Sequence, residues 1–134
     1  MLNLTEAGGQ FPKSKRLLRR ADFQQVYEQG RRQFTGNMTV FFLRRSADAG
    51  ETDALRVGLT VGKVLGGSVE RNRIKRRMRE AVRLSWPAGG APVDVVFNPR
   101  KSVLQLPFAQ LAAEVERGLK LAMQRARKAK AQER

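Results

Sequence analysis

The chain contains no cysteine and no histidine. The lack of cysteine excludes disulfides, thiolate chemistry and cysteine-based zinc sites. Without histidine, any proton transfer by the protein would have to use carboxylates, lysine or tyrosine. The sequence also has no apolar run near the roughly 20 residues that a membrane span needs, and its first ten residues lack the pattern of a secretory signal. We therefore expect a cytoplasmic protein without a membrane partner.

Acidic residues are scarce. The chain has 12 Asp and Glu against 27 Lys and Arg, which gives a formal net charge of +15. Such an excess of one sign predicts a polyanionic partner. Arginine outnumbers lysine by 19 to 8, and this favours structured RNA because a guanidinium group makes bidentate phosphate contacts and stacks on bases. The carboxylates do not occur in a spacing that suggests a two-metal site. We therefore predict neither catalytic residues nor a metal ligand in the protein.

The length of 134 residues indicates a single domain with a modest core. We expect a disordered N-terminal arm over residues 1–14, one RNA-binding domain over 15–124 and a basic C-terminal tail over 125–134. The arm runs into a basic segment, 13–20, with five cations. This segment is interpreted either as an unstructured tail or as a contact with RNA.

The apolar pattern predicts three helices and four strands. Period-two patterning places strands at 31–35, 38–45, 55–63 and 93–98. Helical spacing predicts helices over 21–29, ended by Gly30, over 69–85, capped by Ser68, and from Pro107 onward. Because the helices are segregated from a hairpin-rich sheet, we expect an α+β fold, a two-layer α/β sandwich with a four-stranded, mainly antiparallel sheet.

The predicted helix over 69–85 carries far more positive than negative charge. Its apolar or small residues fall on one narrow side, and polar residues fall on the opposite side. Only Glu70 and Glu80 oppose its cations, whereas a solvated charged helix usually mixes both signs. Self-repulsion would cost stability unless a polyanion neutralises it, so nucleic-acid contact is favoured over a merely solvated helix. The seven cations are Arg71, Arg73, Lys75, Arg76, Arg77, Arg79 and Arg83.

Aromatic residues suggest a second candidate surface. Phe23 and Tyr27 lie one turn apart on the predicted helix over 21–29, and Phe41 lies on the second face of the strand over 38–45. Two aromatics at this spacing are core anchors more often than a stacking platform for bases. Both interpretations stay open at this point.

Residues 63–80 resemble the signature of the bacterial ribonuclease P protein component. The resemblance rests on Arg71-Asn72-Arg73 with the cations and glutamate that follow it, and it extends over about 16–121. It includes the segments 21–27 and 55–61 and the pair Arg100-Lys101. The chain departs from the family at Gly62 and Val64, where the family usually has serine and lysine. It departs again over 66–69, where Gly-Gly-Ser-Val replaces Gly-x-Ala-Val.

The resemblance implies a fold like domain 2 of ribosomal protein S5. Its left-handed βαβ crossover would run through strand 55–63, helix 69–85 and strand 93–98, although right-handed crossovers are the general rule. It also implies two binding sites. Residues that would meet the catalytic RNA are Lys63, Ser68, Arg71, Asn72, Arg73, Lys75, Arg76, Arg79 and Arg83. Residues that would hold the single-stranded 5′ leader of precursor tRNA are Phe23, Tyr27, Phe41, Arg19, Arg56 and Arg100.

The function that the resemblance implies is that of the protein subunit of ribonuclease P, paired 1:1 with its RNA. The RNA would perform the Mg²⁺-dependent removal of the 5′ leader, and the protein itself would bind no cofactor. Two alternatives remain. The chain could be a general basic or ribosome-associated RNA-binding protein with no role in cleavage, or a small metal-dependent nuclease that acts alone.

Overall fold

The computed structural model describes residues 2–3, 19–45 and 54–132 of the chain. The predicted disordered arm lies almost entirely outside these ranges. The elements are β1 (Leu2–Asn3), α1 (Arg20–Gln29), β2 (Arg31–Phe34), β3 (Met38–Arg44), β4 (Arg56–Leu59), the 3-10 helix η2 (Lys63–Leu65), α2 (Ser68–Leu84), β5 (Val93–Pro99), the 3-10 helix η3 (Lys101–Leu104) and α3 (Phe108–Gln132).

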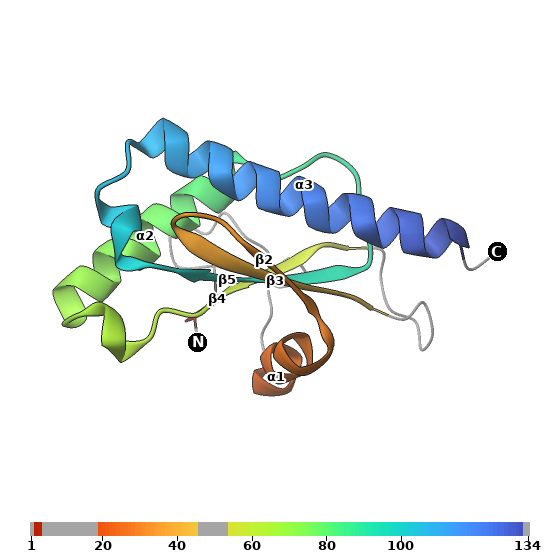
Figure 1. Ribbon diagram of the computed structural model, residues 1–134, viewed down its shortest axis with the longest axis horizontal. Coiled ribbons are helices and arrows are strands. Elements are labelled where there is room, and N and C mark those ends of the chain that lie inside the picture. The colour runs from red at the N-terminus through yellow and green to blue at the C-terminus, as the bar shows by residue number, and fades with distance from the viewer. Residues whose placement is uncertain (1, 4–18, 46–53, 133–134) are drawn as a thin grey trace.

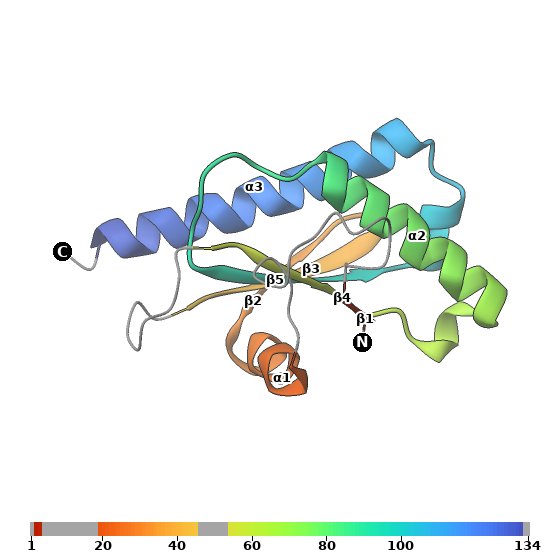
Figure 2. The same cartoon turned by 180° about the vertical axis from the view of Figure 1, so that it is seen from behind.

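The strands form one mixed sheet in the order β1-β4-β5-β3-β2. Only β4 and β5 pair in parallel, and α2 lies between them in the chain; every other pairing is antiparallel. Helices α2 and α3 lie on one face of the sheet and α1 lies on the other (Figures 1 and 2). The α+β class, the three α-helices and the four predicted strands are confirmed. The two-residue strand β1 lies within the segment predicted to be a disordered arm, and it adds a fifth strand to the sheet by pairing with β4.

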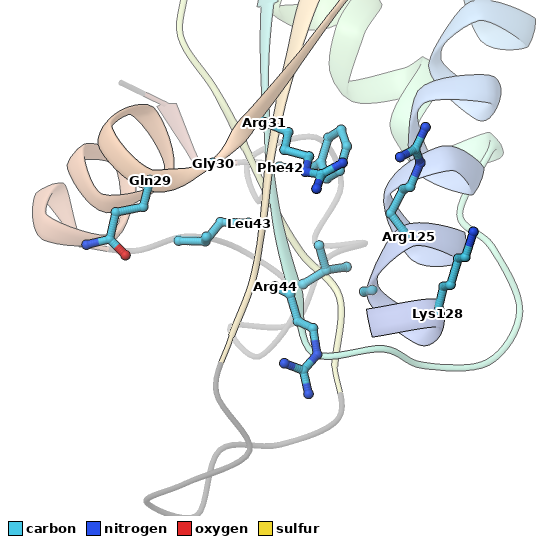
Figure 3. Close-up of a pocket in the computed structure, with 10 residues that line it drawn as sticks. Gln29, Gly30, Arg31, Phe42, Leu43, Arg44, Arg125 and Lys128 are labelled. Carbon is cyan, nitrogen blue, oxygen red and sulfur yellow. The ribbon is translucent and has the colours of Figure 1, made fainter. Parts of the chain in front are cut away.

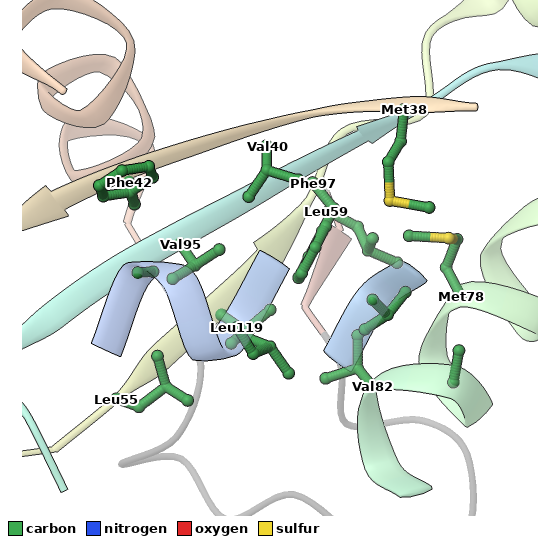
Figure 4. Packing of buried hydrophobic residues seen from close by; sticks show 14 of the residues in the cluster. Met38, Val40, Phe42, Leu55, Leu59, Met78, Val82, Val95, Phe97 and Leu119 are labelled. Atoms are coloured by element: carbon green, nitrogen blue, oxygen red, sulfur yellow. The ribbon is translucent and has the colours of Figure 1, made fainter. Parts of the chain in front are cut away.

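The main core fills the space between the sheet and the helices α2 and α3. Alternate residues of β3, namely Met38, Val40 and Phe42, face this core, as the period of two predicts. They meet Met78 of α2 and Leu119 of α3, among others (Figure 4). Helix α3 approaches closely because Gly118 has no side chain. A Cβ there would lie 3.2 Å from Val40 Cγ2 and 3.3 Å from Phe97 Cε1.

A smaller apolar cluster holds α1 to the opposite face. Phe23 and Val26 of α1 are buried against Val96 of β5, and Tyr27, Phe41 and Leu43 pack around them while partly exposed. Because residues of a strand alternate between faces, β5 serves both clusters: Val95 and Phe97 point to the main core and Val96 points to α1. The sheet is therefore covered by helices on both sides.

Gly30 is the single residue between α1 and β2. The sequence predicts it as the stop of the helix, and the structure shows why glycine is needed. Its φ of −80° is ordinary, but a Cβ would lie 2.4 Å from the carbonyl oxygen of Val26 and 2.7 Å from that of Phe42. Close backbone approach, rather than a left-handed conformation, selects glycine here.

Three predicted boundaries differ from the structure. Strand β4 ends at Leu59, and the chain then turns into η2 instead of continuing to 63. Ser68 is the first residue of α2, not its cap; Gly67 occupies the N-cap position without a side-chain hydrogen bond. Helix α3 continues to Gln132, beyond the predicted domain boundary at 124. Burial of Ala126 against the main core supplies the apolar contact that extends this helix.

Candidate nucleic-acid interface

Helix α2 presents two faces of opposite character. Its buried residues are Ile74, Met78, Ala81 and Val82, which confirms the predicted apolar side. Asn72, Arg73 and Arg76 are exposed on the outside. Arg71, Lys75, Arg79 and Arg83, also in the predicted RNA-binding set, are half-buried. Packing of one narrow stripe thus turns a row of guanidinium groups toward solvent.

Arg77 is a cation of α2 with a structural role. Its guanidinium group donates a hydrogen bond to the carbonyl oxygen of Leu106. The same group lies 5.9 Å from the centroid of the Phe108 ring, which adds a cation–π contact. Arg77 therefore fastens α2 to the start of α3, and its charge is directed into the protein.

Two other cations of α2 form hydrogen bonds to groups of the same helix. Arg79 Nε donates to the carbonyl oxygen of Lys75 at 3.3 Å, and Arg83 Nε donates to Glu80 Oε2 at 3.1 Å. The hydrogen bond from Arg83 lowers the pKa of the Glu80 carboxyl and raises the pKa of Arg83. Glu80 therefore offsets part of the charge of Arg83. Arg73 and Arg76 are left as the most outward cations of the helix.

The start of α2 is built on a tight glycine turn. Gly66 has a φ of 131°, and a Cβ there would lie 2.7 Å from Glu70 Oε2, so the Glu70 side chain folds back over the turn. Glu70 Oε2 in turn lies 2.9 Å from Lys101 Nζ. Lys63 and Ser68, both predicted to bind RNA, are exposed on either side of this turn. The ion pair thus ties the start of η3 to the start of α2.

Sequence reasoning missed two apolar residues beside this turn. Val64 is 94% exposed and Val69 is 72% exposed, which is unusual for large aliphatic side chains. Their positions could have identified them as exposed. Val64 stands where the resembled family has a cation, and Val69 falls on the polar side of the helix.

The structure brings together two of the aromatics predicted to hold the leader. The rings of Tyr27 and Phe41 meet edge to face, with centroids 4.9 Å apart and planes at 88°. The Tyr27 hydroxyl shares a 2.5 Å hydrogen bond with Thr60 Oγ1 and donates to Asn98 Oδ1 at 3.1 Å. Both rings are partly exposed. This arrangement offers an aromatic surface with fixed polar groups beside it.

Phe23 requires a correction. Its side chain is only 2% exposed and is packed against Val26 and Val96, so it offers no ring face to a nucleotide. Of the two open interpretations, the core anchor describes Phe23. It supports the α1 segment from which Tyr27 projects.

Arg56 is held in an ion cluster that the sequence did not predict. Its Nε and Nη2 donate to the two carboxylate oxygens of buried Asp94 at 2.8 and 2.7 Å. Arg45 Nη1 binds the same carboxylate at 2.5 Å, and Asp22 of α1 lies 3.6 Å from Arg56 Nη2. Arg56 is therefore a member of an ion cluster that joins α1, β4 and β5. Of the predicted leader-binding cations, Arg19 and Arg100 are the exposed ones.

The aromatic surface extends to the edge of the sheet through a residue outside the predicted set. Phe34 of β2 is 57% exposed, and the guanidinium carbon of Arg32 lies 5.5 Å from its ring centroid. Both residues share a sheet face with Phe41, since Arg32 pairs with Phe41 and Phe34 with Thr39. The alternation of the strand over 31–35 was the signal that could have identified them.

Across the described residues, no group of three or more Asp, Glu, His or Cys is placed to hold a metal ion. In the same part of the chain, no helix is long and apolar enough to cross a membrane. What the described surface offers is a cationic helix and an aromatic, polar sheet face. Both are suited to binding a polyanion that has unpaired bases.

Comparison with known families gives one clear match. The family model described as Ribonuclease P matches residues 11–123. The ribonuclease P protein component of Symbiobacterium thermophilum is 41% identical over 104 residues, covering 78% of this chain and 87% of the relative. The corresponding protein of Ruegeria pomeroyi is 42% identical over 106 residues, covering 78% of this chain and 82% of the relative.

Solved structures agree with this match. The RNase P protein of Staphylococcus aureus superposes with a TM-score of 0.66 and 30% identity, covering 82% of this chain and 96% of the other. The RNase P protein from Thermotoga maritima gives a TM-score of 0.65 at 24% identity, with 82% and 96% covered, and so supports the fold.

We expect the Asp94 cluster to contribute to stability. Asp94→Asn removes the buried charge that Arg45 and Arg56 share, and should lower the free energy of unfolding by about 3–5 kcal/mol because two cations lose their carboxylate. Urea denaturation followed by circular dichroism measures this loss. Asp22→Asn is the matched control, since Asp22 is more exposed and its contact with Arg56 is longer; its cost should stay below about 1 kcal/mol. Equal losses in the two variants would contradict the assignment.

Proposed function

The chain belongs to the ribonuclease P family, and we propose from this membership that α2 binds the catalytic RNA while the sheet face beside α1 binds the 5′ leader of precursor tRNA. The chain is a protein subunit of ribonuclease P, a ribonucleoprotein of tRNA processing. The family match extends over both surfaces, since it runs from residue 11 to 123.

The observation that carries the RNA-binding proposal is the outward ridge of α2. Arg73 and Arg76 are exposed on the side opposite the buried stripe, and a phosphate backbone would neutralise their charge. The remaining members of the proposed site are Lys63, Ser68, Arg71, Asn72, Lys75, Arg79 and Arg83. These lie on the same helix or immediately before it. Salt-dependent binding follows from this kind of contact, because phosphate contacts release counterions.

The leader-binding proposal is supported by Tyr27 and Phe41. Their partly exposed rings provide a stacking surface for unpaired bases, and stacking of this kind shows little sequence preference. Thr60 and Asn98 hold the Tyr27 hydroxyl and so fix the orientation of the ring.

Arg19 and Arg100 supply exposed charge near this face, while Phe23 and Arg56 support it from within.

We assign the chemistry to the RNA. The described residues offer no histidine, cysteine or clustered carboxylates for hydrolysis, so the Mg²⁺ ions of the reaction would be held by the RNA and substrate. The protein would act in the cytoplasm as one copy per RNA. Its contribution would be substrate affinity and charge neutralisation, and the neutralisation of phosphate charge would reduce the Mg²⁺ concentration that the RNA needs.

Reconstitution tests this division of labour. At low Mg²⁺, ribonuclease P RNA with the chain should form mature tRNA 5′ ends faster than the RNA alone, because the protein neutralises phosphate charge. The chain without RNA should cut nothing. RNA binding without an effect on cleavage would favour a general RNA-binding protein instead. Cleavage by the chain alone would indicate a separate nuclease.

Substitutions of two neighbouring arginines distinguish a contact with RNA from a structural role. Arg76→Gln should leave stability unchanged and reduce the salt dependence of binding to ribonuclease P RNA by about one contact, roughly 0.7–0.9 in the log–log slope. Arg77→Gln should instead lower the melting temperature, since Arg77 packs on Leu106 and Phe108. Filter binding over a salt series and thermal melts measure the two effects. The same slope for Arg76→Gln and the unaltered chain would argue against the α2 site.

Tyr27→Ala tests the leader surface. The assembled holoenzyme should lose about 1–3 kcal/mol of affinity for precursor tRNA with a leader of several nucleotides, because one base loses its stacking partner. Affinity for a substrate with a one-nucleotide leader should not change. Phe23→Leu is the control, because it alters the buried support of α1 and not the exposed ring. Equal losses for both substrates would contradict leader stacking at Tyr27.

A further inference from the structure

A cationic pocket lies between the C-terminal part of α3 and the strands β2 and β3. Its volume is about 370 Å³. Figure 3 shows cationic side chains on both sides of it: Arg31 and Arg44 come from the strands, and Arg125 and Lys128 come from α3. None of the described residues that line it is acidic. We call this cavity, with the four cations that line it, the α3 pocket.

The fold leaves this space open for a simple reason. Strand β2 begins at Arg31, which pairs with Phe42, so β3 runs on past the paired region through Leu43 and Arg44. On the other side, α3 continues past this point, held to the core by Ala126. Two elements thus overhang the end of the β2–β3 pairing, and cations of both line the gap.

The helix dipole explains the presence of only some of these cations. Cations in the last turn of a helix are favoured by the helix dipole, and that effect fades within a turn. Lys128 lies close to the last turn of α3, but Arg125 lies further from the end at Gln132. Arg31 and Arg44 belong to strands, where no such dipole acts. The like charges of Arg31, Arg125 and Lys128 around one pocket repel one another, and an anionic ligand would relieve that repulsion.

The α3 pocket is separate from the ridge of α2. Helix α2 packs beside the N-terminal part of α3, whereas the pocket lies near its C-terminal end (Figures 1 and 2). At 1.5 Å per residue, Phe108 and Arg125 lie about 25 Å apart along the helix. This exceeds the Debye length of about 8 Å at physiological salt. A phosphate bound at one place therefore does little to neutralise the other.

We propose that the α3 pocket binds the phosphodiester backbone of ribonuclease P RNA at a second place, away from α2. The inference rests on the proposed function and adds a contact region to it. Arg31 and Arg125 offer planar guanidinium forks that match phosphate oxygens, and Lys128 offers a compact point charge. A protein that holds one RNA segment on α2 and another near the C-terminal end of α3 would fix the distance between them.

The test compares two pairs of substitutions on the same helix. Arg125→Gln with Lys128→Gln neutralises the pocket, and Arg117→Gln with Lys120→Gln is the matched control. Each pair consists of one arginine and one lysine three residues apart, and all four side chains are exposed. The pocket variant should bind ribonuclease P RNA more weakly, with a log–log salt slope smaller by about 1.4–1.8. The control should keep the slope of the unaltered chain, and thermal melts should show both variants folded.

The outcomes are distinguishable from a failure of the α2 site. Arg76→Gln serves as the reference: if it weakens binding while the pocket variant matches the Arg117/Lys120 control, the proposed function stands and the α3 pocket is not an RNA site. If the pocket variant loses affinity only for precursor tRNA in the assembled holoenzyme, the assignment to the catalytic RNA is overturned. If no form of the chain binds the RNA, the proposed function itself fails.

Discussion

The burial of one narrow stripe of α2 is the constraint on which the arrangement of the surface depends. Ile74, Met78, Ala81 and Val82 are the only residues of this 17-residue helix that are fully buried. Because they lie on one side, nearly every cation of the helix must face outward or toward the rim. Hydrophobic packing therefore fixes the direction of a charge row that would otherwise oppose folding. Glu80 moderates this repulsion by binding Arg83, and Arg77 is directed into the protein.

The central strand β5 divides the molecule into two functional sides. Residues facing α2 and α3 are apolar and belong to the main core. On the α1 side the same strand contributes Asp94, Val96 and Asn98. These three residues have different roles: Asp94 binds two arginines, Val96 packs under α1, and Asn98 accepts a hydrogen bond from Tyr27. The alternation of a strand thus lets one segment organise a hydrophobic core and a polar surface together.

The sequence was sufficient for the class of fold, the element order and the two faces of α2, because these depend on local periodicity. It predicted the wrong role for Phe23, since an aromatic at helical spacing looks the same in a core as on a stacking surface. The ion pair of Arg56 could not be predicted for a related reason. Its partner Asp94 is 38 residues away in the chain, and only the parallel pairing of β4 with β5 brings them together. The α3 pocket likewise requires strands and a helix that are distant in sequence.

Gly30 has a consequence for motion. With one residue between α1 and β2, the end of α1 stays beside the start of β2, and buried Phe23 and Val26 hold the helix against the sheet. The aromatic face beside α1 is therefore preorganised. A single-stranded nucleic acid that binds to this face would lose conformational entropy, whereas the protein would lose little.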